Sequence, residues 1–146
     1  MLNHRRAPLR QAIHQKRLAQ RQCCYGPVLR HPSLNCKQTS ILTQLRTDHV
    51  PLNGHLFRIK KAATLFCPYC PNITESTNHY LFSCHKYARH RHKLIITLKC
   101  KAFTKSFILT DKTAIRHMIN YINDTGRFKQ FLGDIKAELI EDSKRD

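Results

Sequence analysis

Three cysteines and a histidine recur at short intervals in the middle of this chain of 146 residues. Cys67 and Cys70 form a C-x2-C pair, His79 follows after eight residues, and Cys84 after four more. Structural zinc sites use four thiolate or imidazole ligands in a tetrahedron, and a C-x2-C turn directs two thiolates at one ion. The spacing therefore predicts a zinc site whose ligands are Cys67, Cys70, His79 and Cys84.

The four predicted ligands would fill the tetrahedron and leave no open position for a reacting water. We therefore expect a structural site, which would supply much of the folding free energy of its segment. A short helix starting near Thr74 or Ser76 would return His79 and Cys84 to the ion. His85 is the main alternative for the histidine ligand, and His90 is a weaker one.

Other interpretations of the cysteines stay open. The four predicted ligands would also fit ordinary buried cysteines beside a histidine on a helix face, and a C-x2-C redox centre would need a surrounding βαβ pattern that the sequence lacks. The remaining cysteines have no organised spacing and are expected to be ordinary thiols. They are Cys23, Cys24, Cys36 and Cys100.

The charge of the chain favours a polyanionic partner. Lys and Arg number 26 against 9 Asp and Glu, which gives a formal net charge of +17. The excess lies within the first 109 residues, where Asp48 and Glu75 are the only acids. Such a surface repels itself unless a polyanion such as nucleic acid neutralises it.

The same composition excludes several enzyme classes. Two carboxylates in the basic part of the chain are too few for the acidic metal ligands of a nuclease or polymerase. With only four glycines there is no phosphate-binding loop, and no G-x-S-x-G motif is present. We therefore expect no enzymatic activity and no small-molecule substrate.

Apolar residues at helical spacing predict a mostly α-helical fold. A first short helix carries Ile41, Leu42 and Leu45 and must end near Val50-Pro51, and a second carries Leu52, Leu56 and Ile59. Residues 86–98 predict a basic amphipathic helix with Tyr87, Leu94, Ile95 and Leu98 on its apolar face. Strand-like alternation of useful length is absent.

The end of the chain predicts a helical hairpin. Its first stripe contains Ile115, Met118, Ile119 and Ile122, and residues 123–126 form the turn. The second stripe contains Phe128, Phe131, Leu132, Ile135 and Leu139. We thus expect a flexible basic arm over residues 1–38, a zinc-binding helical module over 39–100, and the hairpin and tail over 101–146.

No apolar segment resembles a secretory leader or a membrane span, so we expect an intracellular protein with reduced thiols and no membrane contact. Two basic clusters, Arg58-Ile-Lys-Lys61 and Lys86 to Lys93, are compatible with nuclear localisation, although a basic run alone is a weak localisation signal.

Several linked motifs resemble one known family. Residues 40–59 (SILTQLRTDHVPLNGHLFRI) precede Cys67-x-x-Cys70, and then follow Asn78-His-Tyr-Leu-Phe-Ser-Cys84, Tyr87-Ala-Arg-His-Arg91 and Tyr121-Ile-Asn-Asp-Thr-Gly-Arg-Phe128. Together they resemble the C-terminal zinc-binding tail of non-LTR (LINE-like) retrotransposon reverse transcriptase/ribonuclease H polyproteins, particularly fungal ones, over residues 31–130. The resemblance carries the same four zinc ligands onto this chain.

Two positions depart from the family pattern. Asp48 stands where glycine is usual, which would alter the helix exit, and His85 follows Cys84 where proline is common, which would let His85 compete for the metal. The polymerase and ribonuclease H domains are absent from the 146 residues. The resemblance therefore implies a detached or decayed tail.

Taken together, these features predict nonspecific RNA or DNA binding through phosphate contacts. Tyr69, Tyr80 and Tyr87 are candidates for base stacking, although their apolar surroundings favour the core. A protein-interaction module organised by zinc and a relic without selected function are the alternatives. The candidate phosphate-binding residues are Arg5, Arg6, Lys16, Arg17, Arg21, Lys60, Lys61, Lys86, Arg89, Arg91 and Lys93.

Overall fold

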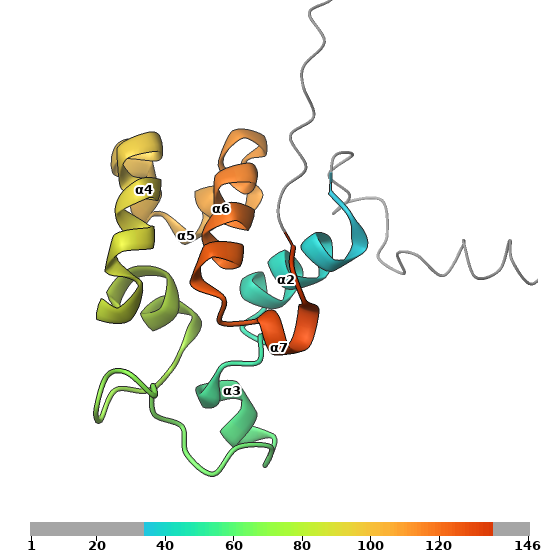
Figure 1. Cartoon of the computed structure of the whole chain (residues 1–146), viewed down its shortest axis with the longest axis vertical. Coiled ribbons are helices and arrows are strands. Elements are labelled where there is room, and N and C mark those ends of the chain that lie inside the picture. The colour runs from blue at the N-terminus through green and yellow to red at the C-terminus, as the bar shows by residue number, and fades with distance from the viewer. Residues whose placement is uncertain (1–33, 136–146) are drawn as a thin grey trace, which may run out of the picture. The chain divides into compact units, whose positions relative to one another are not determined.

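The computed structural model describes residues 34–135, and this part of the chain is mostly helical, as predicted (Figure 1). Its helices are α2 (Cys36–Arg46), α3 (Asn53–Arg58), the π-helix η2 (His79–Ser83), the 3-10 helix η3 (His85–Tyr87), α4 (Ala88–Leu98), the 3-10 helix η4 (Lys99–Phe103), α5 (Lys105–Thr110), α6 (Lys112–Thr125) and α7 (Lys129–Leu132). The described residues contain no β-strand and one isolated antiparallel β-bridge, between Phe66 and Thr74. None of the helices in this range is both long and apolar enough to cross a bilayer.

Helix α2 begins inside the predicted basic arm, whose first 33 residues lie outside the described part of the chain. Asn35 and Gln38 form a capping box, in which each side chain accepts a hydrogen bond of 3.0 Å from the backbone N–H of the other. The predicted apolar stripe of Ile41, Leu42 and Leu45 is buried.

The prediction that this helix ends near Val50 was wrong by four residues, because α2 ends at Arg46. The His49 N–H donates to the Gln44 carbonyl at 3.0 Å, and Asp48 adopts a left-handed conformation with φ of 58°. This is the Schellman arrangement that closes a helix, and it favours glycine at the left-handed position. Asp48 thus takes a backbone conformation that glycine adopts more readily.

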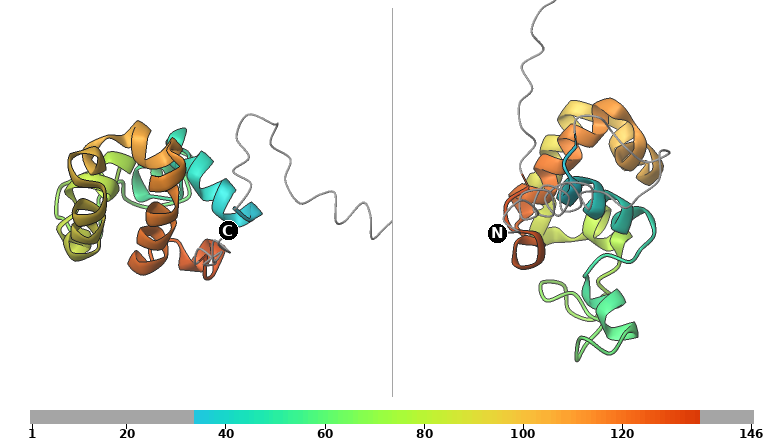
Figure 2. Two further views of the ribbon diagram at one scale, coloured as in Figure 1. Left: turned by 90° about the horizontal axis from the view of Figure 1, so that it is seen from above. Right: turned by 90° about the vertical axis from the view of Figure 1, so that its right-hand side faces the viewer.

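Helices α4 and α6 pack side by side, as Figures 1 and 2 show from two directions. Asp111 caps α6 by accepting from the backbone N–H groups of Thr113 and Ala114. Gly126 ends the helix in the left-handed conformation with φ of 62°. The predicted stripe of α6 is buried throughout and consists of Ile115, Met118, Ile119 and Ile122.

The predicted C-terminal hairpin is only partly present. Its second helix, α7, is a single turn that Gly133 ends at φ of 69°. Phe128 and Ile135 are buried, but Phe131 is 54% exposed, and Leu139 lies outside the described residues. The Gln38 side chain donates to the Ile135 carbonyl at 3.2 Å, so the segment after α7 packs on α2 instead of extending a hairpin.

A buried ion pair joins the cysteine-rich segment to the turn after α6. Arg127 Nε and Nη2 each donate to one oxygen of Glu75 at 2.7 Å, and Glu75 is 1% exposed. The backbone N–H of Asn53, at the start of α3, also donates to Glu75 Oε2 at 2.7 Å. The carboxylate therefore links α3, the residues before η2 and the end of α6.

Arg127→Ala should lower the free energy of unfolding by about 3–5 kcal/mol, because it leaves a buried carboxylate without its cation. The matched control is Lys129→Ala, whose ion pair with Asp134 is exposed and should be worth about 1 kcal/mol or less. Urea unfolding followed by circular dichroism measures both. Equal losses in the two variants would contradict the role given to Glu75.

Candidate metal centre

The four predicted metal ligands converge on one point. All four side chains are buried, and their ligand atoms lie within 4.8 Å of one another. Cys84 Sγ lies 3.8 Å from both Cys67 Sγ and Cys70 Sγ. A tetrahedron with metal–sulfur bonds of about 2.3 Å has sulfur–sulfur edges of about 3.8 Å. The spacing of the thiols therefore fits one tetrahedral ion.

A tight turn presents the first two ligands. The Cys67 N–H donates to the Ile73 carbonyl at 2.8 Å, and the Ile73 N–H reaches back to the Cys70 carbonyl at 3.4 Å. Asn72 closes this turn in the left-handed conformation with φ of 61°, which asparagine adopts more readily than most residues. Both thiols are consequently held on the inner side of the turn.

The second pair of ligands depends on η2. The Ser76 hydroxyl accepts from the His79 N–H at 3.1 Å, so the helical turn begins at one of the predicted positions. The Cys84 N–H then donates to the His79 carbonyl at 2.8 Å, five residues back. In an α-helix residues five apart point about 140° away from each other. The π turn brings His79 and Cys84 to the same side.

The electrostatics of the centre fit a cation. His79 Nε2 is buried without a hydrogen-bond partner. Burial lowers the pKa of His79, which keeps the ring neutral and its lone pair available. Burial, together with the neighbouring Cys70 and Cys67 thiols, raises the pKa of Cys84 to about 12. A bound metal ion would supply the positive charge that thiolates need here.

His85 lies beside the four ligands and not among them. Its Nδ1 is 3.1 Å from Cys70 Sγ, and its ring is exposed. This contact is suited to orienting a ligand from outside, a role that metal sites commonly fill with a hydrogen bond. The other alternative ligand, His90, is also outside the group of four.

Two features of the centre escaped the sequence analysis. Arg91 Nη2 donates to the Cys84 carbonyl at 2.8 Å, so this predicted phosphate-binding residue is half-buried and already engaged. Glu75 stands four residues before His79 and fixes the segment through Arg127. The sequence did contain a signal for Glu75, because a single acid within a strongly basic stretch indicates a specific partner.

The other predicted nucleic-acid contacts differ in their surroundings. Lys60, Lys61 and Arg89 are exposed. Lys93 is also exposed and pairs with Asp124 at 3.4 Å. The Lys86 ammonium lies 5.1 Å from the centre of the Tyr69 ring. The predicted residues Arg5, Arg6, Lys16, Arg17 and Arg21 lie outside the described part of the chain.

The three candidate stacking tyrosines separate clearly. Tyr80 is fully buried and Tyr87 is 3% exposed, and their rings meet edge to face at a centroid distance of 5.3 Å. These two side chains belong to the core. Tyr69 is 42% exposed and remains available to a ligand.

Cys70→Ser should remove metal binding and, with it, much of the helicity, because binding of the ion would join the Cys67–Cys70 turn to η2 and so contribute to the folding free energy. Cys100→Ser changes an exposed thiol outside the cluster and should behave as the wild type. Native mass spectrometry gives the metal content, and circular dichroism during chelation follows the fold. Full helicity in a metal-free Cys70→Ser chain would contradict a structural centre.

Two variants, His79→Ala and His85→Ala, should distinguish a metal ligand from a residue that only hydrogen-bonds a ligand. Loss of the His85 contact should weaken metal affinity by about 10- to 100-fold and keep the tetrahedral geometry. Loss of His79 should weaken the affinity further and change the visible spectrum of the cobalt(II) form. The reverse order of effects would make His85 the ligand.

None of the family models, curated proteins or solved structures matches this chain. A proposal for its function therefore rests on the geometry of the metal centre and on the charge around it.

Proposed function

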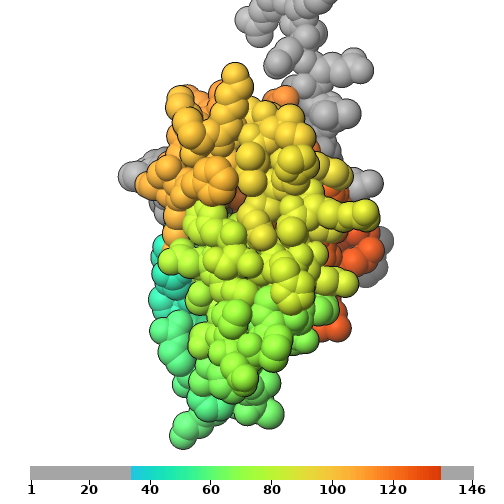
Figure 3. All heavy atoms as spheres, turned by 90° about the vertical axis from the view of Figure 1, so that its left-hand side faces the viewer, coloured from blue at the N-terminus to red at the C-terminus, as the bar shows by residue number. Residues whose placement is uncertain are grey.

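We propose that this chain is a non-catalytic, zinc-stabilised module that binds RNA or DNA nonspecifically through phosphate contacts. The observation that carries the proposal is the charge of residues 58–93, which include the cysteine-rich centre: their exposed cations are accompanied by one acid, the buried Glu75. Figure 3 shows α4 and the segment before it together on one face.

Zinc is the proposed ion because of the donor set. Three thiols and an imidazole form a combination typical of structural zinc sites, and the thiol spacing of 3.8 Å suits its bond length. Four protein ligands leave no open position, which supports a structural role and argues against catalysis.

The acids of the described residues are already engaged, which leaves many cations for an external partner. Four carboxylates are in ion pairs and the fifth, Asp111, caps α6. Lys60, Lys61 and Arg89 have no carboxylate partner within residues 34–135. Exposed cations of this kind bind phosphates and release counterions.

Tyr69 and Lys86 offer a second type of contact at the same face. Tyr69 is exposed, and Lys86 stands over its ring. An aromatic ring beside a cation suits a nucleotide, whose base stacks while its phosphate pairs with the ammonium. The pair therefore supports nucleic acid over a purely apolar partner.

We also propose that the chain derives from the tail of a non-LTR retrotransposon polyprotein. The left-handed backbone at Asp48 supports this origin, because the related pattern has glycine there. Two residues of the last linked motif also have structural roles: Gly126 ends α6, and Arg127 forms the ion pair with Glu75. The residues that carry the resemblance are thus ones that hold this fold together.

Nucleic-acid affinity of the zinc-loaded chain should fall as salt rises, with log K decreasing linearly against log salt. Arg89→Gln and Lys86→Gln should each reduce the magnitude of that slope by about 1, whatever the base sequence. Fluorescence anisotropy with a labelled oligonucleotide measures it.

Lys129→Gln, which removes the same charge from α7, is the matched control and should keep the slope. Heparin should displace the oligonucleotide if phosphate contacts dominate. Absence of binding at low salt, or binding that heparin and salt leave unchanged, would refute the proposal and favour a protein partner.

A further inference from the structure

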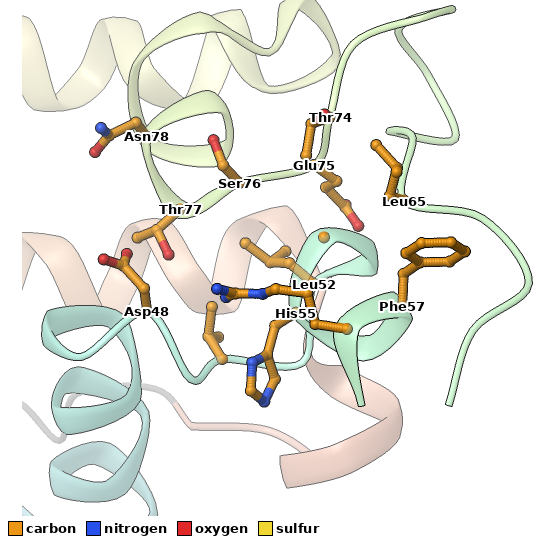
Figure 4. Close-up of a pocket in the computed structure, with 13 residues that line it drawn as sticks. Asp48, Leu52, His55, Phe57, Leu65, Thr74, Glu75, Ser76, Thr77 and Asn78 are labelled. Atoms are coloured by element: carbon orange, nitrogen blue, oxygen red, sulfur yellow. The ribbon is translucent and has the colours of Figure 1, made fainter. Parts of the chain in front are cut away.

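A cavity of about 570 Å³ lies between α3 and residues 74–78, outside the metal centre (Figure 4). Pockets for small organic groups usually measure about 300–1,000 Å³, so the cavity has room for a nucleobase and its sugar. The buried side chains of Val50 and Leu52 contribute apolar surface to it.

One wall offers an aromatic ring. Phe57 and Leu65 stand on the same side of the cavity, and Phe57 is 43% exposed. An exposed phenylalanine at an open cavity presents a surface on which a flat ring can stack. His55, two residues before Phe57 in α3, adds an imidazole to the lining.

The opposite wall carries hydrogen-bonding groups. Asp48, Thr77 and Asn78 lie across from Phe57 in Figure 4. Burial alone would raise the pKa of Asp48, but hydrogen bonds from Lys105 and Thr77 outweigh burial and lower it. The carboxylate therefore remains an ionised acceptor, able to receive N–H groups from the edge of a base.

Cations gather at the end of α3 next to the cavity. Arg58 is part of the lining, and Lys60 and Lys61 follow it. Lys60 adopts a left-handed conformation with φ of 58°, and the Lys61 N–H closes the helix on the Leu56 carbonyl at 2.8 Å. This closure holds the basic segment beside the cavity, where phosphates flanking a bound base would lie.

We propose that this cavity binds one unpaired base of a single-stranded nucleic acid, stacked on Phe57, with its edge toward Asp48 and its flanking phosphates at Arg58, Lys60 and Lys61. The inference rests on the proposed nucleic-acid binding and adds a preference for single strands over duplexes. Bases in a duplex are already stacked and paired, so they cannot enter. An apolar peptide side chain would use none of the hydrogen-bonding groups on that wall.

The test compares Phe57→Ala with Phe103→Ala in the full, zinc-loaded chain. Both phenylalanines are exposed, so neither change should disturb the core, and Phe103 is not part of the cavity. Phe57→Ala should weaken binding of a single-stranded 12-mer by about 5- to 150-fold, the value of one lost stack, and leave duplex binding unchanged. Phe103→Ala should change neither.

Crosslinking gives a second readout that does not depend on affinity. A single-stranded oligonucleotide with 5-iodouridine should crosslink within residues 48–58 or 74–78, located by mass spectrometry. Crosslinks confined to Tyr69 or to residues 86–93 would overturn the proposal.

The outcomes separate this inference from the function on which it rests. A wild-type chain that binds neither single strands nor duplexes would refute both. Salt-sensitive binding of the wild type could also come with a Phe57→Ala variant that weakens single-strand and duplex binding equally, or neither. That result would overturn the base-binding cavity alone, and a protein partner would then be the better occupant.

Discussion

The buried carboxylate of Glu75 is the interaction on which the rest of the structure depends. Burying a charge is expensive unless donors surround it, and here Arg127 and the Asn53 N–H supply them. These donors come from α3 and from the turn after α6. The chain also approaches closely at this point, since a Cβ on Gly54 would lie 2.9 Å from the Glu75 carbonyl oxygen. Glycine at position 54 and the ion pair therefore hold α3 against the segment that enters the metal centre.

The candidate metal centre and the aromatic core are built from the same short helix. The π turn of η2 directs His79 and Cys84 to the ligand cluster, while Tyr80 between them is fully buried among other rings. Tyr121 donates its hydroxyl to the Tyr80 carbonyl at 2.8 Å, so α6 stabilises the backbone of this turn. Metal binding and packing of α6 should consequently support each other, because both require the same conformation of residues 79–84.

The proposed nucleic-acid contacts fall on two surfaces. One comprises the exposed cations of α4 and the Tyr69–Lys86 pair, and the other is the cavity beside α3. Each surface combines an aromatic ring with nearby cations, and the proposed nucleic-acid contacts rest on this combination. Within residues 34–135 the acids form ion pairs or cap a helix, so most cations of this part of the chain have no carboxylate partner.

The sequence by itself determined the local features of this protein. The apolar stripes of α2 and α6 and the four convergent ligands were predictable, because helical periodicity and ligand spacing act over a few residues. Only the tertiary structure decided that Glu75 meets Arg127 across 52 positions, that α7 stops after one turn, and that Tyr80 and Tyr87 are core while Tyr69 is exposed. It also decided where the cavity beside Phe57 lies. The physical reason is that ion pairs, side-chain burial and cavities depend on which distant segments pack together, and a local pattern does not record that packing.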